Sequence, residues 1–156
     1  MSKIFTYNHN VIVPYPARVV FDVVDDVAAY HRFLPNCSGS GVISRTLTTI
    51  PTERVLGYMD LSFLGLRYRL DSDNLHTHSS HINMTLLKGP FKSLVGHWQF
   101  MPLGIIGSPD EGCKVSLNMQ WQYNNPMLAL TIGQRFEGIA KQLLDAFIAE
   151  TARRIQ

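Results

Sequence analysis

Residues 113–124 read CKVSLNMQWQYN, and this stretch decides the fold class. Apolar and polar residues alternate strictly along it, which is the period of a β-strand with one buried and one solvated face. The apolar set is Cys113, Val115, Leu117, Met119, Trp121 and Tyr123. A looser alternation upstream, with Leu94, Trp98 and Phe100 opposed to His97 and Gln99, predicts its hairpin partner. One face of an antiparallel sheet must therefore meet apolar material.

The C-terminal residues supply that material. Asn124, Asn125 and Pro126 form a cap with a proline tolerated in the first turn, and predict one helix that runs to about Arg154. At 1.5 Å per residue such a helix spans roughly 40 Å. Its apolar stripe, at spacings of three and four, comprises Leu128, Ile132, Phe136, Ile139, Ala140, Leu143, Phe147 and Ile148. We expect this stripe to pack on the sheet.

The remaining chain completes an α+β architecture. Residues 4–13 predict a first strand, ended by Pro14 and Pro16, and residues 17–34 predict two short helices separated near Asp25-Asp26. Residues 38–124 predict six strands, with breaks at 50–51, 64–65, 71–80, 88–90 and 104–112. This order predicts the helix-grip fold: a curved antiparallel sheet of about seven strands around a long C-terminal helix, with residues 1–156 as a single domain. A gap between helix and sheet would be an apolar pocket.

Composition limits the function classes. The 14 Lys and Arg against 12 Asp and Glu give a net charge of +2, far from the basic stripe of a dedicated nucleic-acid-binding protein, and we expect no DNA partner. Weak contact with RNA or anionic lipid stays open. Two cysteines, Cys37 and Cys113, are too few for a disulfide framework, so we expect free thiols. The first residues carry no signal-peptide or transit pattern, which predicts a cytoplasmic protein with at most peripheral contact at the inner membrane.

Two blocks carry a family resemblance. Val24, Asp26-Val27, Tyr30, Phe33-Leu34-Pro35 and Cys37 fit V-x-D-V-x-x-Y-x-x-F-L-P-x-C, and residues 89–100 fit G-P-F-x-x-L-x-G-x-W-x-F, followed by Cys113-Lys114-Val115. These blocks resemble the coenzyme-Q-binding START-like family of the polyketide cyclase/dehydrase and lipid transport superfamily. The resemblance implies the helix-grip fold and a hydrophobic ligand site. The family has a mitochondrial branch that binds coenzyme Q and a bacterial branch that includes the ribosome-association toxin, and the missing transit pattern favours the bacterial one.

Three functions follow from this resemblance. The leading hypothesis is non-enzymatic binding of a hydrophobic small molecule, an isoprenoid quinone such as ubiquinone, in an internal cavity in support of respiration, with no cofactor required. The alternative is a ribosome-association toxin that binds the large ribosomal subunit and blocks translation initiation. A polyketide cyclase-like enzyme is the weaker alternative, because the sequence names no acid–base pair and no catalytic motif.

The candidate site residues come from the apolar faces. The expected cavity wall comprises Phe33, Leu34, Pro35, Leu94, Trp98, Phe100, Leu117, Met119, Trp121, Phe136, Ala140, Leu143 and Phe147. For Phe33-Leu34-Pro35, closing one end of a cavity and plain core packing are both open. Ile105 and Ile106, flanked by Gly104 and Gly107, predict an entrance loop that contacts a membrane or the helix.

The remaining polar candidates, three histidines, two arginines and one cysteine, are assigned no metal-binding or catalytic role. His76, His78 and His81 could in principle hold a metal, but residues 71–80 are interpreted as a solvated turn, so no metal site is expected. Arg67 and Arg69 are expected to be exposed. Cys37 has no base placed beside it, and no catalytic residue is assigned.

Overall fold

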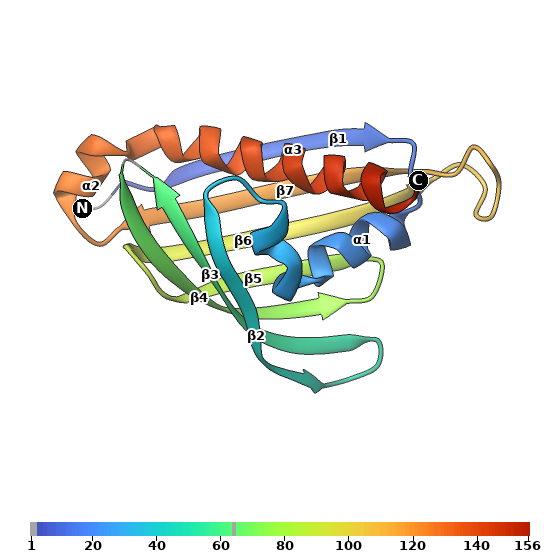
Figure 1. Cartoon of the computed structure of the whole chain (residues 1–156), viewed down its shortest axis with the longest axis horizontal. Helices are drawn as coiled ribbons and strands as arrows, with labels where there is room; N and C mark the ends of the chain where they lie inside the picture. Colours follow the sequence, from blue (N-terminus) through green and yellow to red (C-terminus); the bar gives the residue numbers. More distant parts are fainter. Residues whose placement is uncertain (1–2, 64) are drawn as a thin grey trace.

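The computed structural model describes residues 3–63 and 65–156, which form one antiparallel sheet and a set of helices across it (Figure 1). The elements in chain order are β1 (Phe5–Val13), α1 (Ala17–Asp25), the 3-10 helix η1 (Val27–Arg32), β2 (Cys37–Leu47), β3 (Thr52–Phe63), β4 (Leu66–Thr77), β5 (His81–Lys88), β6 (Phe91–Leu103), β7 (Gly112–Tyr123), α2 (Pro126–Thr131), η2 (Gly133–Arg135) and α3 (Phe136–Arg154). The α+β helix-grip architecture predicted from the alternation and the helical stripe is confirmed.

The sheet places the first strand beside the last. Its order is β1-β7-β6-β5-β4-β3-β2, and the neighbouring strands are antiparallel. β1 pairs with β7 in the register Phe5↔Trp121, which places both aromatic rings on the inner face, stacked with centroids 5.8 Å apart. Figure 1 shows α3 running along this face, with α1 and η1 beside its C-terminal half. The alternation in β7 is confirmed, since its apolar residues are buried.

The C-terminal helix is interrupted, which corrects the prediction of one continuous helix over 126–154. The predicted cap is present, because Asn125 Oδ1 accepts a 2.8 Å hydrogen bond from the Met127 amide. Gly133 then adopts φ +48°, a left-handed conformation that a regular helix does not contain. The helical path therefore restarts at Phe136, and only α3 lies across the sheet as a regular helix.

Residues 71–80 were predicted as a solvated turn, and this prediction is wrong. β4 continues through Thr77, and only His78–Ser80 form the turn, where Ser79 has φ +60°. The polar composition misleads because alternate polar side chains of β4 point inward and are hydrogen-bonded there. The remaining predicted breaks coincide with turns, including Gly65 at φ +77°, while Leu64 lies outside the described residues.

The core joins α1 to the sheet. Val20, Phe21, Val23 and Val24 of α1 are almost fully buried, and Leu144 of α3 is buried with them. Cys37 and Cys113 are buried free thiols, as predicted. Burial raises the pKa of the Cys113 thiol to about 11, which opposes thiolate chemistry there.

Candidate functional site

An apolar cavity lies between α3 and the inner face of the sheet, with about 120 Å³ available to the centres of water-sized molecules. By that measure it holds on the order of ten water-sized groups. Its lining residues are Val24, Val27, Tyr30, Tyr58, Met59, Leu61, Leu70, Ser72, Asn74, His76, Ile82, Met84, Leu86, Leu94, Gly96, Trp98, Leu117, Met119, Phe136, Ala140, Leu143 and Phe147. Side chains from α1, η1, five strands and α3 therefore enclose one space.

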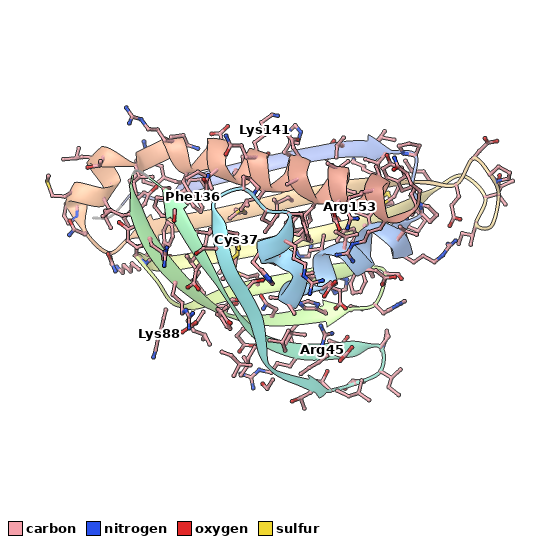
Figure 2. The ribbon with its side chains drawn as sticks, in the orientation of Figure 1. Cys37, Arg45, Lys88, Phe136, Lys141 and Arg153 are labelled. Atoms are coloured by element: carbon pink, nitrogen blue, oxygen red, sulfur yellow. The ribbon has the colours of Figure 1, made fainter. Side chains whose placement is uncertain are left out.

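The residues that line the cavity recur with the helical period on α3 and at every second position on the strands. Phe136, Ala140, Leu143 and Phe147 recur every three or four residues and share the inner face of α3. Figure 2 labels Phe136 at the start of α3, where its ring faces Trp121 at 5.2 Å between centroids. Gly96 on β6 keeps the floor open, because a Cβ there would lie 3.2 Å from the Met84 Cε atom.

The predicted wall residues divide into two groups. Those that line the cavity are Leu94, Trp98, Leu117, Met119, Phe136, Ala140, Leu143 and Phe147. Leu34, Phe100 and Trp121 are instead packed in the core, Phe33 lies half-buried near Arg154, and Pro35 is exposed. Phe100 and Trp121 share the inner face, but Phe21 packs on Phe100 at 5.6 Å between ring centroids. The ring of Phe21 therefore occupies the space beside Phe100 that a ligand would need.

The expected entrance loop lies away from the cavity. Ile105 and Ile106 are 78% and 72% exposed, so they do not fold back on the helix. Figure 1 shows residues 104–111 projecting past the C-terminal end of α3. No residue of that loop lines the cavity, so its role in ligand access stays a prediction.

A polar row on β4 interrupts the apolar wall, and sequence reasoning missed it. Ser72, Asn74 and His76 follow Leu70 at every second position, which is the signal that could have placed them on the inner face. Asn74 is 5% exposed, and its Nδ2 donates 3.0 Å hydrogen bonds to the Val55 carbonyl and to Ser72 Oγ. Burial of the Asn74 amide nitrogen is thus compensated.

His76 is joined to α1 and β2. Its side chain is 3% exposed, and its Nδ1 lies 2.6 Å from Asp25 Oδ1. Arg45 donates to the same oxygen at 3.1 Å and to the Asp25 backbone carbonyl at 3.1 Å, and it approaches Glu53 at 3.4 Å. Burial would raise the pKa of Asp25, but the hydrogen bonds from His76 and Arg45 outweigh it and lower the pKa. The carboxylate is therefore held ionised.

Tyr30 connects the cavity wall to α1. Its hydroxyl donates a hydrogen bond to the Val24 backbone carbonyl. Burial, together with the nearby carboxylates of Asp25 and Asp26, raises the pKa of Tyr30 far above its usual value. Its ring packs edge-on against Phe147 with centroids 5.0 Å apart. Tyr30 thus presents a neutral, already bonded hydroxyl.

A second, polar pocket lies between η1 and the end of α3, lined by Asp26, Ala29, Arg32, Phe33, Glu150, Arg153 and Arg154. Glu150 is 6% exposed and accepts hydrogen bonds of 2.7 and 2.6 Å from Arg153 and of 2.9 Å from Arg154. Hydrogen bonds from Arg153 overcome the burial of Glu150 and, with Arg154, lower its pKa to about 2. Three arginines against two carboxylates leave this pocket with a net positive charge.

The remaining polar candidates lie outside the cavity. Arg67 and Arg69 are exposed, as predicted, and Arg69 pairs with Asp60 at 2.8 Å. Within residues 3–63 and 65–156, no three His, Cys, Asp or Glu side chains are grouped to hold a metal ion. No helix of the described chain has the length and apolar character needed to span a membrane.

Comparison with known proteins places this site in a family. A sequence model described as polyketide cyclase / dehydrase and lipid transport matches residues 13–148. The chain is 35% identical to the ribosome association toxin RatA of Pseudomonas aeruginosa over 136 residues, covering 87% of this chain and 88% of the toxin. It is 24% identical to the mitochondrial coenzyme Q-binding protein COQ10 of Drosophila melanogaster, covering 95% of this chain and 59% of that protein.

A solved structure repeats the fold. A START superfamily protein from Mycobacterium smegmatis superposes with a TM-score of 0.77 at 17% identity, covering 95% of this chain and 97% of that one. At this identity the match concerns the fold alone. The family match and the fold match agree on the architecture that surrounds the cavity.

Proposed function

The chain belongs to the polyketide cyclase/dehydrase and lipid transport family, and from that premise we propose that it binds a hydrophobic small molecule of the isoprenoid quinone class in the cavity under α3. The observation that carries the proposal is the cavity itself: its wall is built mainly from aliphatic and aromatic side chains, with a short polar row on β4. Such a lining suits an apolar ring that carries a few oxygen atoms.

The size of the cavity limits how much ligand it takes. Space for on the order of ten water-sized groups suits a substituted ring and the first carbons of a tail, but not a long isoprenoid chain. The proposal is therefore that the ring is buried and the tail leaves the cavity. We propose that no reaction occurs on the ligand and that no cofactor is needed.

Filling the cavity tests this proposal. Leu143 lines the cavity and is half-buried, so Leu143→Trp should occupy the ligand space without a large cost in stability. Ile139 is also half-buried on α3 but does not line the cavity, so Ile139→Trp is the matched control. Binding of ubiquinone-1, measured by tryptophan fluorescence quenching corrected for the added indole, should be lost in the first variant and kept in the second. Equal binding by both would refute the cavity as the site.

Material from the native source gives a second readout. Protein purified from a membrane-containing lysate should release a quinone on solvent extraction, detected by mass spectrometry. Extraction of a different apolar molecule would correct the ligand class while retaining the binding function.

Ribosome binding is a second candidate, because the similarity to a ribosome association toxin is the stronger of the two curated matches above. On this chain the exposed guanidinium of Arg153 in the net positive pocket is the group we propose to meet phosphate. Figure 2 labels Arg153 near η1 and Lys141 on the opposite border of α3. Arg153→Glu should abolish co-sedimentation with large ribosomal subunits, whereas Lys141→Glu should not. Co-sedimentation of both variants would remove this surface from consideration.

Cyclase-like chemistry is a third candidate, and one observation favours it. The structure brings together an acid–base pair that the sequence did not reveal, His76 at the cavity wall and the ionised Asp25, which does not line the cavity. Incubation with a poly-keto substrate mimic and analysis by mass spectrometry tests it. Turnover lost in His76→Phe would support an enzyme, while recovery of the unchanged substrate supports a binding protein.

A further inference from the structure

His76 presents one ring nitrogen to Asp25 and keeps the other unengaged. Nδ1 lies 2.6 Å from Asp25 Oδ1, whereas no residue within 3–63 and 65–156 forms a hydrogen bond with Nε2. The side chain is 3% exposed and lines the cavity. The unengaged nitrogen thus belongs to the polar row of a mainly apolar wall.

The hydrogen-bond network assigns the tautomer. Asp25 Oδ1 also accepts from the Arg45 guanidinium, and an ionised carboxylate can only accept, so the hydrogen between Asp25 and His76 resides on Nδ1. In a neutral imidazole with Nδ1 protonated, Nε2 is an acceptor. At His76 the cavity wall therefore offers a lone pair, not a proton.

The charged groups next to His76 are Asp25, Arg45 and Glu53. Arg45 already compensates the carboxylate of Asp25, while Glu53 lies at the outer side of Arg45. At pH 8 a free imidazole, with its usual pKa of about 6.5, is neutral, and the tautomer given above is that of the neutral ring.

Asn74 adds a second hydrogen-bond acceptor on the same face of β4. Both hydrogens of its amide are used, one by the Val55 carbonyl and one by Ser72 Oγ, which leaves the amide oxygen as an acceptor. Asn74 and His76 are two positions apart on the same face of the strand, so the two acceptors are neighbours. The hydroxyls of Ser72 and Tyr58 can take either role.

We infer that the cavity selects a ring that carries a hydroxyl group, a phenol or the reduced, quinol form of a quinone, which donates a hydrogen bond to His76 Nε2. This inference rests on the proposed binding function and makes it more specific. A ring with only carbonyl or ether oxygens leaves both acceptors unpaired and faces their lone pairs, which costs affinity.

A matched pair of stable probes isolates this hydrogen bond. 2-Naphthol can donate to Nε2, and 2-methoxynaphthalene cannot, although it is the more hydrophobic of the two. Titrations by intrinsic fluorescence at about pH 8, above the usual histidine pKa of about 6.5, compare them on the full chain. We expect 2-naphthol to bind about twofold to twelvefold more tightly, the range for one neutral hydrogen bond. Reduced ubiquinone-1 under argon should likewise bind more tightly than its oxidised form.

Substitution then locates the effect. His76→Phe keeps a ring in the wall but removes the acceptor, so the preference for 2-naphthol should disappear. His78→Phe, in the exposed turn after β4, should keep it.

Equal binding of the two probes to the wild-type chain, or an unchanged preference in folded His76→Phe, would overturn the inference and leave the binding function intact. If neither probe nor ubiquinone-1 binds, the proposed function fails as well. The comparison of probes on the wild-type chain requires no variant, so it decides the question even if His76→Phe does not fold.

Discussion

Tyr123 Oη donates a 2.6 Å hydrogen bond to the carbonyl oxygen of Gly133, so the last residue of β7 holds the point at which the C-terminal helix is interrupted. The bond places the start of α3 over the sheet, where Phe136 closes one end of the cavity against Trp121 and Phe91. An interruption in the helix is thereby tied to the geometry of the cavity.

Tyr123→Phe should lower the free energy of unfolding by about 0.5–1.5 kcal/mol, because the Gly133 carbonyl loses its partner in a partly buried position. Urea denaturation measures the change. Tyr68→Phe is the control, because the Tyr68 hydroxyl has no hydrogen bond to any of the described residues. Equal losses in the two variants would mean that the bond to Gly133 does not stabilise the fold.

Leu143 and Leu144 are neighbours in α3, but Leu143 lines the cavity and Leu144 is packed in the core. Leu144 is 1% exposed and packed in the core, so Leu144→Ala should cost about 2–5 kcal/mol of stability. Leu143 is half-buried and lines the cavity, so Leu143→Ala should cost less but weaken ubiquinone-1 binding, and Leu143→Asp should abolish it by placing a charge in the wall. Thermal melts and binding titrations check the pair. A larger stability loss in Leu143→Ala than in Leu144→Ala would contradict this assignment.

The low pKa of Glu150 predicts that the stability of the fold decreases at acid pH. Its pKa is about 2 in the folded protein, below the ordinary carboxyl value of 4.5, so its ionisation stabilises the fold above pH 4.5, and that contribution is lost as the pH falls toward 2. The urea midpoint of the wild-type chain should therefore fall more steeply between about pH 5 and pH 3 than that of Glu150→Gln. Asp145→Asn changes an exposed carboxylate paired with Lys141 and serves as the control. Parallel pH profiles for wild type and Glu150→Gln would exclude this role.

The histidines of the β4–β5 hairpin should not bind zinc stoichiometrically. His76 points into the cavity wall toward Asp25, whereas His78 is exposed in the turn and bonds to Ser79. Elemental analysis of the purified protein measures this directly. One tightly held zinc per chain that is lost in His76→Ala or His78→Ala would contradict it.

Ile105 and Ile106 should affect ligand delivery and leave affinity unchanged, because they are exposed and do not line the cavity. Replacing both with serine removes apolar area that would gain roughly 1.5–3 kcal/mol per side chain on burial in a membrane. Transfer of quinone from liposomes, followed by stopped-flow fluorescence, should slow, while affinity for detergent-presented quinone stays within a few fold. A parallel loss of affinity would show that the loop contributes to the site.

The cavity wall could be predicted only in part from the sequence. Leu117 and Met119, or Phe136 and Phe147, follow from strand and helix periods, because a periodic apolar face identifies which side chains point inward. The same periods cannot tell a cavity from a packed core. Trp121 faces inward like Met119, but Phe136 lies directly over Trp121, and that contact depends on where the helix is interrupted.

The sequence by itself determined the order of the elements along the chain, the inner face of β7 and part of the stripe of α3, because local periodicity and caps depend on near neighbours along the chain. The predicted stripe contained the half-buried Leu143 and omitted its buried neighbour Leu144. Only the tertiary structure decided that His76 meets Asp25, 51 positions earlier in the chain, and that both meet Arg45 of β2. A buried histidine on a polar strand cannot be distinguished from a solvated one by composition. Its environment arises from long-range packing of α1 against the sheet, and that packing makes His76 a polar group of the cavity wall.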